Sequence, residues 1–191
     1  KGLDRKFSVY DALAVGPAMR PLIDAGHLCE YRIYGPKTDL DLRGVEIGDT
    51  GDFKANQLSA AAKKSRIVGD VVDHYLRIAP GKLNVVFATD VDMAEEHAEA
   101  FRARGVTAAV LSDRTSDVDR VRIIDAFERK EIMVICNVDV LGEGFDCPGI
   151  ECVQFARPTA SYGLYVQQFG RVLRIQAGKA FGIIIDHVGN V

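Results

Sequence analysis

Long apolar runs are missing from this sequence, since no stretch approaches the length that a helix needs to cross a membrane. The first residues, KGLDRKFSVYDAL, match neither a secretory signal nor a transit peptide, and internal repeats and low-complexity tracts are also absent. We therefore expect a globular protein without a membrane partner. Because the chain begins abruptly, we also expect it to be a piece of a longer protein.

Cysteine is scarce, and its spacing is not that of a metal site. The four cysteines, Cys29, Cys136, Cys147 and Cys152, form no CxxC pair. Cys136 and Cys152 fall within apolar runs typical of buried strands, which favours reduced core thiols over zinc ligands or disulfides. We expect no metal site on this chain and a reducing, cytoplasmic location.

An excess of positive charge is missing too. The 24 Lys and Arg residues against 27 Asp and Glu give a formal net charge of −3, which argues against binding nucleic acid by bulk electrostatics. Any nucleic-acid groove must be a local feature. The length of 191 residues and the hydrophobic content of 48% suit one domain with a substantial core.

The familiar phosphate-binding loops are also absent. The GxxxxGK[ST] pattern does not occur, and Pro36 stands where its second glycine would precede Lys37 and Thr38. No GxGxxG opens a helix after a strand, which counts against a Rossmann-type small-molecule enzyme. No DExx box follows an apolar strand, so we expect that this chain alone does not hold ATP in a hydrolytic pose.

What is present is a regular alternation of apolar runs and helical patterns from Leu83 onward. It predicts βαβ units, and hence an α/β fold with a mostly parallel sheet and helices on both faces. The expected strands are 84–88, 106–111, 132–136, 151–156 and 181–185, and the expected helices are 92–104, 117–129 and 161–174.

The first part of the chain, residues 1–80, is interpreted as a lead-in segment that packs on the main domain, residues 81–191. Within it we expect a short helix ending at Ala25 and a helix surface position for His74. The other expected elements are a strand over 27–34, an exposed connection over 38–54, and helices over 55–64 and 65–79.

The last predicted helix, which Ser161 can cap, carries two distinct faces. Gln167, Arg171 and Arg174 are spaced four and three apart, so two guanidinium groups and an amide should lie together. A solvated amphipathic helix is the simpler interpretation of such a pair of arginines. The apolar face expected to pack on the core consists of Tyr162, Val166, Phe169 and Leu173.

Three short motifs occur in order around this helix: EGFDxP over 143–148, RPTxS over 157–161 and QxxGRxxR over 167–174. Together they resemble motifs V and VI of superfamily 2 helicases. More narrowly, they are similar to the DEAD/DEAH-type branch that includes restriction-enzyme helicase subunits and bacterial DNA-repair helicases. The resemblance covers 84–186 and implies a C-terminal RecA-like domain, a three-layer sandwich.

By this resemblance, Arg171 and Arg174 are catalytic arginine fingers that reach ATP across an interdomain cleft. Arginine suits this role because its planar, permanently charged fork can meet phosphate oxygens in the transition state. Gly144, Asp146 and Gln167 are expected to complete the nucleotide side of the cleft, although an acid in a turn is commonly a local cap. ATP and Mg²⁺ would be held mainly by an N-terminal RecA-like domain of the same parent chain.

The resemblance also places nucleic acid, and DNA in particular, across the carboxyl ends of the strands. Hydroxyls, amides and helix N-terminal N–H groups can bind phosphates there. Thr89, Asn137 and, more weakly, Ser112 match positions that touch the nucleic-acid backbone, although each could equally be a helix cap. This chain has Asn137 and Glu143 where many relatives carry Thr and Arg.

The resemblance implies the C-terminal half of an ATP-dependent DNA helicase or translocase. The isolated chain is expected to be inactive, because the enzyme is the whole parent protein. The alternative is a nucleotide-independent nucleic-acid-binding or scaffold domain with the same fold. The two arginines of the last helix count against that alternative.

Overall fold

The described strands form one sheet and all run in the same direction. The computed structural model describes residues 16–37, 39–49, 51–65, 67–138, 140 and 147–190. Within these residues, six strands form one sheet in the order β1-β6-β5-β2-β4-β3, and each strand pairing is parallel. The strands are β1 (Glu30–Tyr34), β2 (Asn84–Phe87), β3 (Ala108–Leu111), β4 (Val134–Asn137), β5 (Cys152–Phe155) and β6 (Phe181–Asp186).

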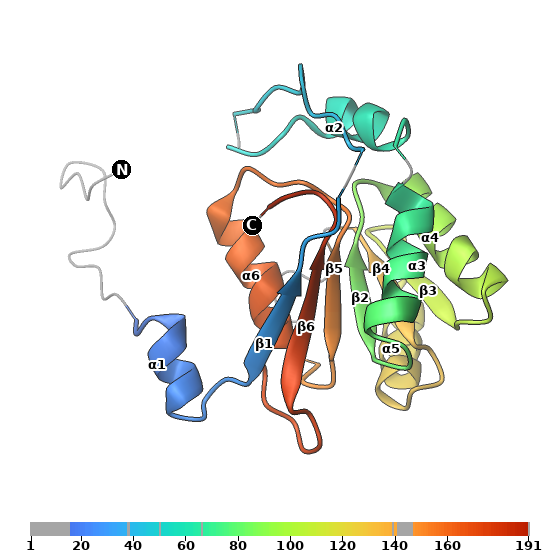
Figure 1. Cartoon of the computed structure of the whole chain (residues 1–191). Coiled ribbons are helices and arrows are strands. Elements are labelled where there is room, and N and C mark those ends of the chain that lie inside the picture. Colours follow the sequence, from blue (N-terminus) through green and yellow to red (C-terminus); the bar gives the residue numbers. More distant parts are fainter. Residues whose placement is uncertain are drawn as a thin grey trace.

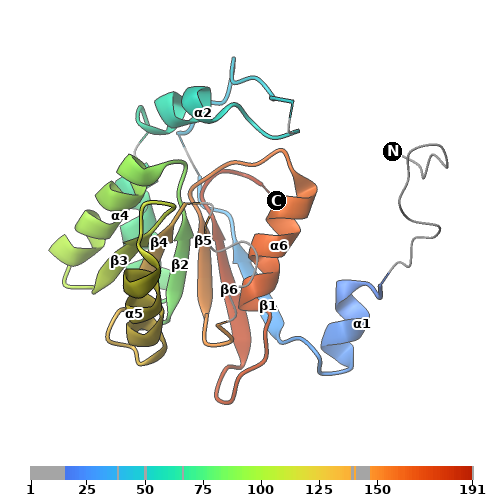
Figure 2. The ribbon, with the colours of Figure 1, turned by 180° about the vertical axis from the view of Figure 1, so that it is seen from behind.

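Helices cover both faces of the sheet, so the chain has three layers. Figure 1 shows α3 (Ile67–Ile78) and α4 (Val91–Ala103) on one face, and Figure 2 shows α5 (Asp117–Glu128) and α6 (Tyr162–Val172) on the other. The shorter α1 (Met19–Asp24) and α2 (Ala55–Ala62) precede them. The predicted α/β class and layered architecture are confirmed, and the strands and helices predicted after Leu83 end within two residues of their expected bounds.

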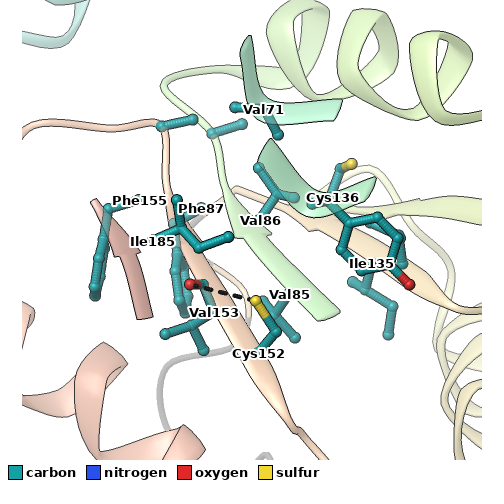
Figure 3. Packing of buried hydrophobic residues seen from close by; sticks show 14 of the residues in the cluster. Val71, Val85, Val86, Phe87, Ile135, Cys136, Cys152, Val153, Phe155 and Ile185 are labelled. Atoms are coloured by element: carbon teal, nitrogen blue, oxygen red, sulfur yellow. Dashed lines mark hydrogen bonds between the residues drawn. The ribbon is translucent and has the colours of Figure 1, made fainter. Parts of the chain in front are cut away.

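The core lies between the helices and the central strands. Every residue of β2, β4 and β5 is buried, because helices cover both sides of these strands. Figure 3 shows their side chains packed together, with Val71 of α3 close to Val86 of β2. Cys136 and Cys152 are free thiols within this core, and burial raises the pKa of both, as expected for unreactive core cysteines.

The lead-in segment contributes to the same sheet and core. β1 pairs with β6 along its whole length, from Glu30 beside Phe181 to Tyr34 beside Ile185. One side of α3 is buried in the core, while α2 and the connection before it lie over the carboxyl ends of the strands (Figure 1). The division between a lead-in and a main domain near residue 80 stays a prediction. None of the described helices combines the length and apolar character that crossing a membrane requires.

Candidate nucleotide and nucleic-acid interface

The helix α6 begins at a side-chain cap and packs along β5 and β6. Ser161, just before it, accepts a hydrogen bond from the backbone N–H of Leu164 at 3.4 Å, as the sequence predicted. The Tyr165 ring lies 5.1 Å from the Phe155 ring of β5 and 5.8 Å from the Phe169 ring. These ring contacts fix which side of α6 faces the sheet.

The buried stripe of α6 is rotated relative to the predicted one. Tyr162 was expected in the core but is 80% exposed, so that prediction is wrong. Tyr165, Phe169 and Val172, spaced four and three apart, line the sheet side instead. The physical reason is that Phe155 offers its ring to Tyr165, while the phenol of Tyr162 can remain hydrated.

Two arginines lie at or just past the C-terminal end of α6 and differ in exposure: Arg171 is in the last helical turn, and Arg174 follows the C-cap Leu173. Arg171 is only 7% exposed, Arg174 is half-buried, and Gln167 on the preceding turn is exposed. Arg171 therefore does not lie on a solvated face of the helix, as the simpler interpretation of an amphipathic helix would have it. Both arginines carry a positive charge near the negative end of the helix dipole, which stabilises them there in any case. Gly144 and Asp146, the other predicted nucleotide-side residues, lie outside the described part of the chain.

The predicted backbone-contact residues lie along one edge of the sheet. Asn137 ends β4, where it stands opposite Phe87 of β2 on one side and Leu111 of β3 on the other. Thr89 and Ser112 follow those two neighbouring strands. Strand order and parallel direction therefore bring the three polar side chains to the carboxyl ends of β2, β4 and β3, where ligands of such sheets bind.

Thr89 and Ser112 make local hydrogen bonds. Thr89 is 7% exposed, and its Oγ1 donates to Asp90 Oδ2 at 3.2 Å. Ser112 Oγ accepts from the Arg114 backbone N–H at 3.2 Å. Both residues therefore shape the turns that follow their strands.

Asn137 also organises the turn after its strand. It is 2% exposed, and its Oδ1 accepts a hydrogen bond from the Val140 backbone N–H at 3.3 Å. A phosphate that touched the side chains of this sheet edge would have to compete with bonds of this kind.

A hollow of about 510 Å³ opens at this edge beneath α2. Asn56 and Ser59 of α2, Thr89, Asp90 and Arg114 are among the residues that line it. Carboxylates outnumber the guanidinium in the lining, so the hollow does not attract phosphate by charge alone.

Asp90 joins α2 to α4 within this hollow. It caps α4 by accepting from the Met93 backbone N–H at 2.9 Å, and it also accepts the Ser59 hydroxyl. Burial alone would raise the pKa of Asp90, but the hydrogen bonds from Ser59, Met93 and Thr89 outweigh it and hold the pKa below its usual range. Asp90 is therefore an ionised cap at neutral pH.

Asp52 is the residue near this edge that sequence reasoning missed. The connection over 38–54 was expected to be exposed, but Asp52 is 8% exposed and forms an ion pair with Arg157 at 3.2 Å. No local pattern separates Asp52 from Asp49 in this acid-rich stretch, because the burial comes from a partner far along the chain.

Three histidines lie close together: His74 of α3, His97 of α4 and His187, which follows β6. His97 is fully buried and His187 is 2% exposed. His187 Nε2 lies 2.8 Å from Gln154 Oε1, and its ring centroid lies 5.2 Å from that of His74. His74 was predicted on a helix surface, but it is half-buried against His187. Desolvation lowers the pKa of His97 to about 4 and that of His187 to about 3, with His74 and His97 also lowering the latter.

Metal-binding geometry is not found among the residues that the structure describes. No group of three or more His, Cys, Asp or Glu side chains within them is placed to hold a metal ion, and this includes the three histidines.

The described sheet is parallel and covered by helices on both faces, and the QxxGRxxR segment lies at the end of α6 against β5 and β6. Together with the similarities given next, these features identify a RecA-like helicase domain of superfamily 2. The family model of the helicase conserved C-terminal domain matches residues 66–176, and the chain belongs to this family. The family match includes α3 and α6 but not Asp52.

Similar proteins match most of this chain. A 51.5 kDa protein of a Lactococcus phage is 33% identical over 95% of this chain and 39% of its own length. IRC3 of Saccharomyces cerevisiae, assigned as an ATP-dependent helicase, is 28% identical over 95% of this chain and 27% of its own. Among solved structures, the Escherichia coli DEAD-box protein SrmB has a TM-score of 0.59 at 20% identity, over 83% of this chain and 77% of that one. The chain thus spans well under half the length of these two curated relatives.

Proposed function

We propose that this chain is the C-terminal half of an ATP-dependent DNA helicase or translocase. An N-terminal RecA-like domain of the same parent protein would bind ATP, and α6 would present Arg171 and Arg174 to the terminal phosphate. Closing and reopening of the cleft between the two domains would then move the protein along a strand. The backbone of that strand would pass the carboxyl ends of β2, β4 and β3, at Thr89, Asn137 and Ser112.

The observation that carries this proposal is the pair of arginines at the end of α6 in a domain of the helicase family. Each guanidinium offers several N–H donors in a planar fork, a donor set that fits the oxygens of a phosphoryl group. Gln167 is exposed one turn earlier, where it can contact a partner domain. Gly144 and Asp146 stay part of the proposed nucleotide side of the cleft.

The chemistry of ATP cleavage is supplied by the nucleotide with Mg²⁺, whose ligands we assign to the partner domain. The part assigned to this chain is electrostatic. Arg171 and Arg174 would stabilise the charge that develops on the transferred phosphoryl group, and Gln167 would help to order the cleft around them.

One observation favours the alternative, a nucleotide-independent binding or scaffold domain. Arg171 is buried within this chain, and a buried arginine can serve the packing of α6 rather than a ligand. The two functions differ in one measurable property, which is ATP turnover that depends on the arginines.

The first prediction separates the parent protein from the isolated chain. We expect the full-length parent to hydrolyse ATP faster when single-stranded DNA is added, and the 191-residue chain to show no such turnover because it lacks a P-loop. The measurement is steady-state ATP hydrolysis with and without single-stranded DNA, with RNA of the same sequence as a second probe. DNA-stimulated turnover by the pure isolated chain would contradict the half-enzyme proposal, and stimulation by RNA alone would correct the nucleic acid.

The second prediction concerns the carboxyl edge of the sheet. The isolated chain should bind single-stranded DNA weakly and with strong salt dependence, because contacts to phosphates release counterions while the net charge of −3 opposes approach. Thr89→Ala and Asn137→Ala should each weaken binding about three- to tenfold at low salt, the loss of one hydrogen bond of about 1 kcal/mol. Fluorescence anisotropy of a labelled oligonucleotide measures this.

The matched control is Thr107→Ala at the opposite edge of the same sheet. Thr107 Oγ1 accepts the Met133 backbone N–H at 3.1 Å, so this variant also loses a local hydrogen bond. We expect its DNA affinity to stay at the wild-type value. Equal weakening in all three variants would show that the effect is structural and would remove Thr89 and Asn137 from the interface.

A further inference from the structure

A carboxylate from the lead-in segment holds the chain immediately before α6. Asp52 Oδ2 accepts a hydrogen bond from Arg157 Nη2 at 3.2 Å, and Asp52 Oδ1 accepts one from the Ala160 backbone N–H at 2.8 Å. The two ion-paired side chains are 13% exposed for Arg157 and 11% exposed for Asp52. Solvent therefore screens this pair much less than an ordinary surface ion pair.

Further hydrogen bonds hold the turn between Arg157 and Ser161. The Ser161 backbone N–H donates to Thr159 Oγ1 at 3.0 Å, and Thr159 N–H donates to Asn190 Oδ1 at 2.9 Å. Asn190 Nδ2 donates in turn to the Arg157 carbonyl at 3.2 Å. The turn over 157–161 is thus fixed by side chains from two distant parts of the chain, one before and one after it.

The opposite end of α6 is held separately, and again by the lead-in segment. The Cys29 backbone N–H donates to the carbonyl of Leu173, just past the helix, at 2.9 Å. α6 also approaches β6 closely there, since a Cβ added at Gly182 would lie 2.6 Å from the Val172 carbonyl oxygen. These contacts hold the C-terminal end of α6, and the ring contacts of Tyr165 and Phe169 set which side of the helix faces the sheet. The contacts of Asp52 hold the chain at its N-terminal end.

A rotation of α6 about its own axis displaces the guanidinium groups that it carries, so only a small rotation can be tolerated. An arginine side chain reaches about 6 Å or more from the helix axis, so a rotation of about 10° would move its guanidinium by about 1 Å. Misplacing a group by about 1 Å in a reactive complex can cost on the order of 100-fold in rate. An anchor that holds the start of α6 adds to the contacts that set this rotation, and so has a catalytic consequence without touching the nucleotide.

We infer that Asp52 is a positioning residue for the arginine pair. By binding Arg157 and the Ala160 N–H, it sets the start of α6, and through the helix it sets where Arg171 and Arg174 point. Asp52 lies outside the matched family region 66–176. By this inference, the lead-in segment contributes to placing the arginine pair. This inference rests on the proposed function.

The test uses the full-length parent and measures kcat, the KM for ATP and the melting temperature, with turnover assayed well below every melting transition. Asp52→Asn should lower kcat about 10- to 100-fold and change KM less than about threefold, because it disturbs placement rather than ATP binding. The matched control is Asp41→Asn in the same segment, which breaks an exposed ion pair with Arg43. Its kcat should equal that of the wild type.

A double variant separates positioning from general loss of structure. If Asp52 acts through the arginines, adding Asp52→Asn to Arg171→Ala should lower kcat little further, since the group being positioned is already gone. Equal fold-losses in the wild-type and Arg171→Ala backgrounds would overturn the inference. So would an Asp52→Asn enzyme as active as Asp41→Asn.

Failure of the inference and failure of the proposed function remain distinguishable. Full activity of Asp52→Asn alongside an inactive Arg171→Ala refutes only the positioning role, whereas full activity of both refutes the arginine-finger function itself. Should Asp52→Asn alone not fold, the pair Asp52→Asn with Arg157→Gln removes the buried charge and keeps an amide hydrogen bond possible. The same loss of kcat is expected from that pair, and normal kcat would overturn the inference.

Discussion

Alanine at Arg171 or at Arg174 in the full-length parent is expected to lower nucleic-acid-stimulated ATP turnover by about 10³- to 10⁵-fold. Each guanidinium would meet charge that develops on the transferred phosphoryl group, so its loss acts on the transition state. The affinity for ATP should fall much less, because the partner domain holds most of the nucleotide. Turnover and the KM for ATP, measured together, give both quantities.

Lysine at position 171 should not restore turnover. An ammonium group keeps the charge but loses the planar fork with its parallel donors. A Lys variant that recovers most of the activity would show that charge alone is needed there, and would argue against a paired contact to one phosphoryl group.

The difference in burial between the two arginines calls for a stability control. Arg171 is 7% exposed, so Arg171→Ala also removes packing and should lower the melting temperature more than Arg174→Ala, whose side chain is half-buried. Arg174→Ala is therefore the cleaner test. Lost turnover with unchanged melting would place its guanidinium in the chemistry, and normal turnover in both variants would leave the arginines as structural residues at a helix end.

The strands after Leu83 were predictable because burial on both faces leaves a direct mark on the sequence. Buried parallel strands are continuous apolar runs, and β2, β3 and β5 are each followed by a helix with its own side-chain cap, such as Ser116 before α5. The strand order was not predictable in the same way. β1 lies beside β6 at the edge of the sheet, and nothing local in Glu30–Tyr34 indicates that neighbour.

The residues that were missed are those whose environment comes from distant segments. Asp52 resembles other acids of a solvated loop, and only Arg157, more than one hundred positions later, makes it a buried ion pair. The same holds for His97, which a helical pattern cannot distinguish from a surface histidine. Motifs could indicate the arginines of α6, but their unequal burial depends on how the helix is rotated against β5 and β6.

The buried histidines make the stability of this chain sensitive to mild acid. Desolvation lowers the pKa of His97 to about 4, and neither of its ring nitrogens has a hydrogen-bond partner among the described residues. In the unfolded chain a histidine has a pKa of about 6.5. Between these values the unfolded state binds more protons than the folded state, so the free energy of unfolding falls as the pH is lowered from about 6.5 to about 4.

The expected loss from His97 alone is on the order of 3 kcal/mol across that window, a large part of the stability of an ordinary domain. His187 adds to the loss, since its pKa is lowered to about 3 by burial and by its histidine neighbours. Asp90 and Glu151, whose pKa values are held below their usual range, lose their contribution to stability below about pH 5, so only the lower part of the histidine window overlaps theirs. Urea unfolding at a series of pH values should show a slope that His97→Leu flattens and that His27→Gln, at an exposed site, leaves unchanged. If His97→Leu keeps the wild-type slope between pH 6.5 and 4, then His97 is not the group that takes up the proton, and the acid sensitivity belongs to His187 or to the carboxylates.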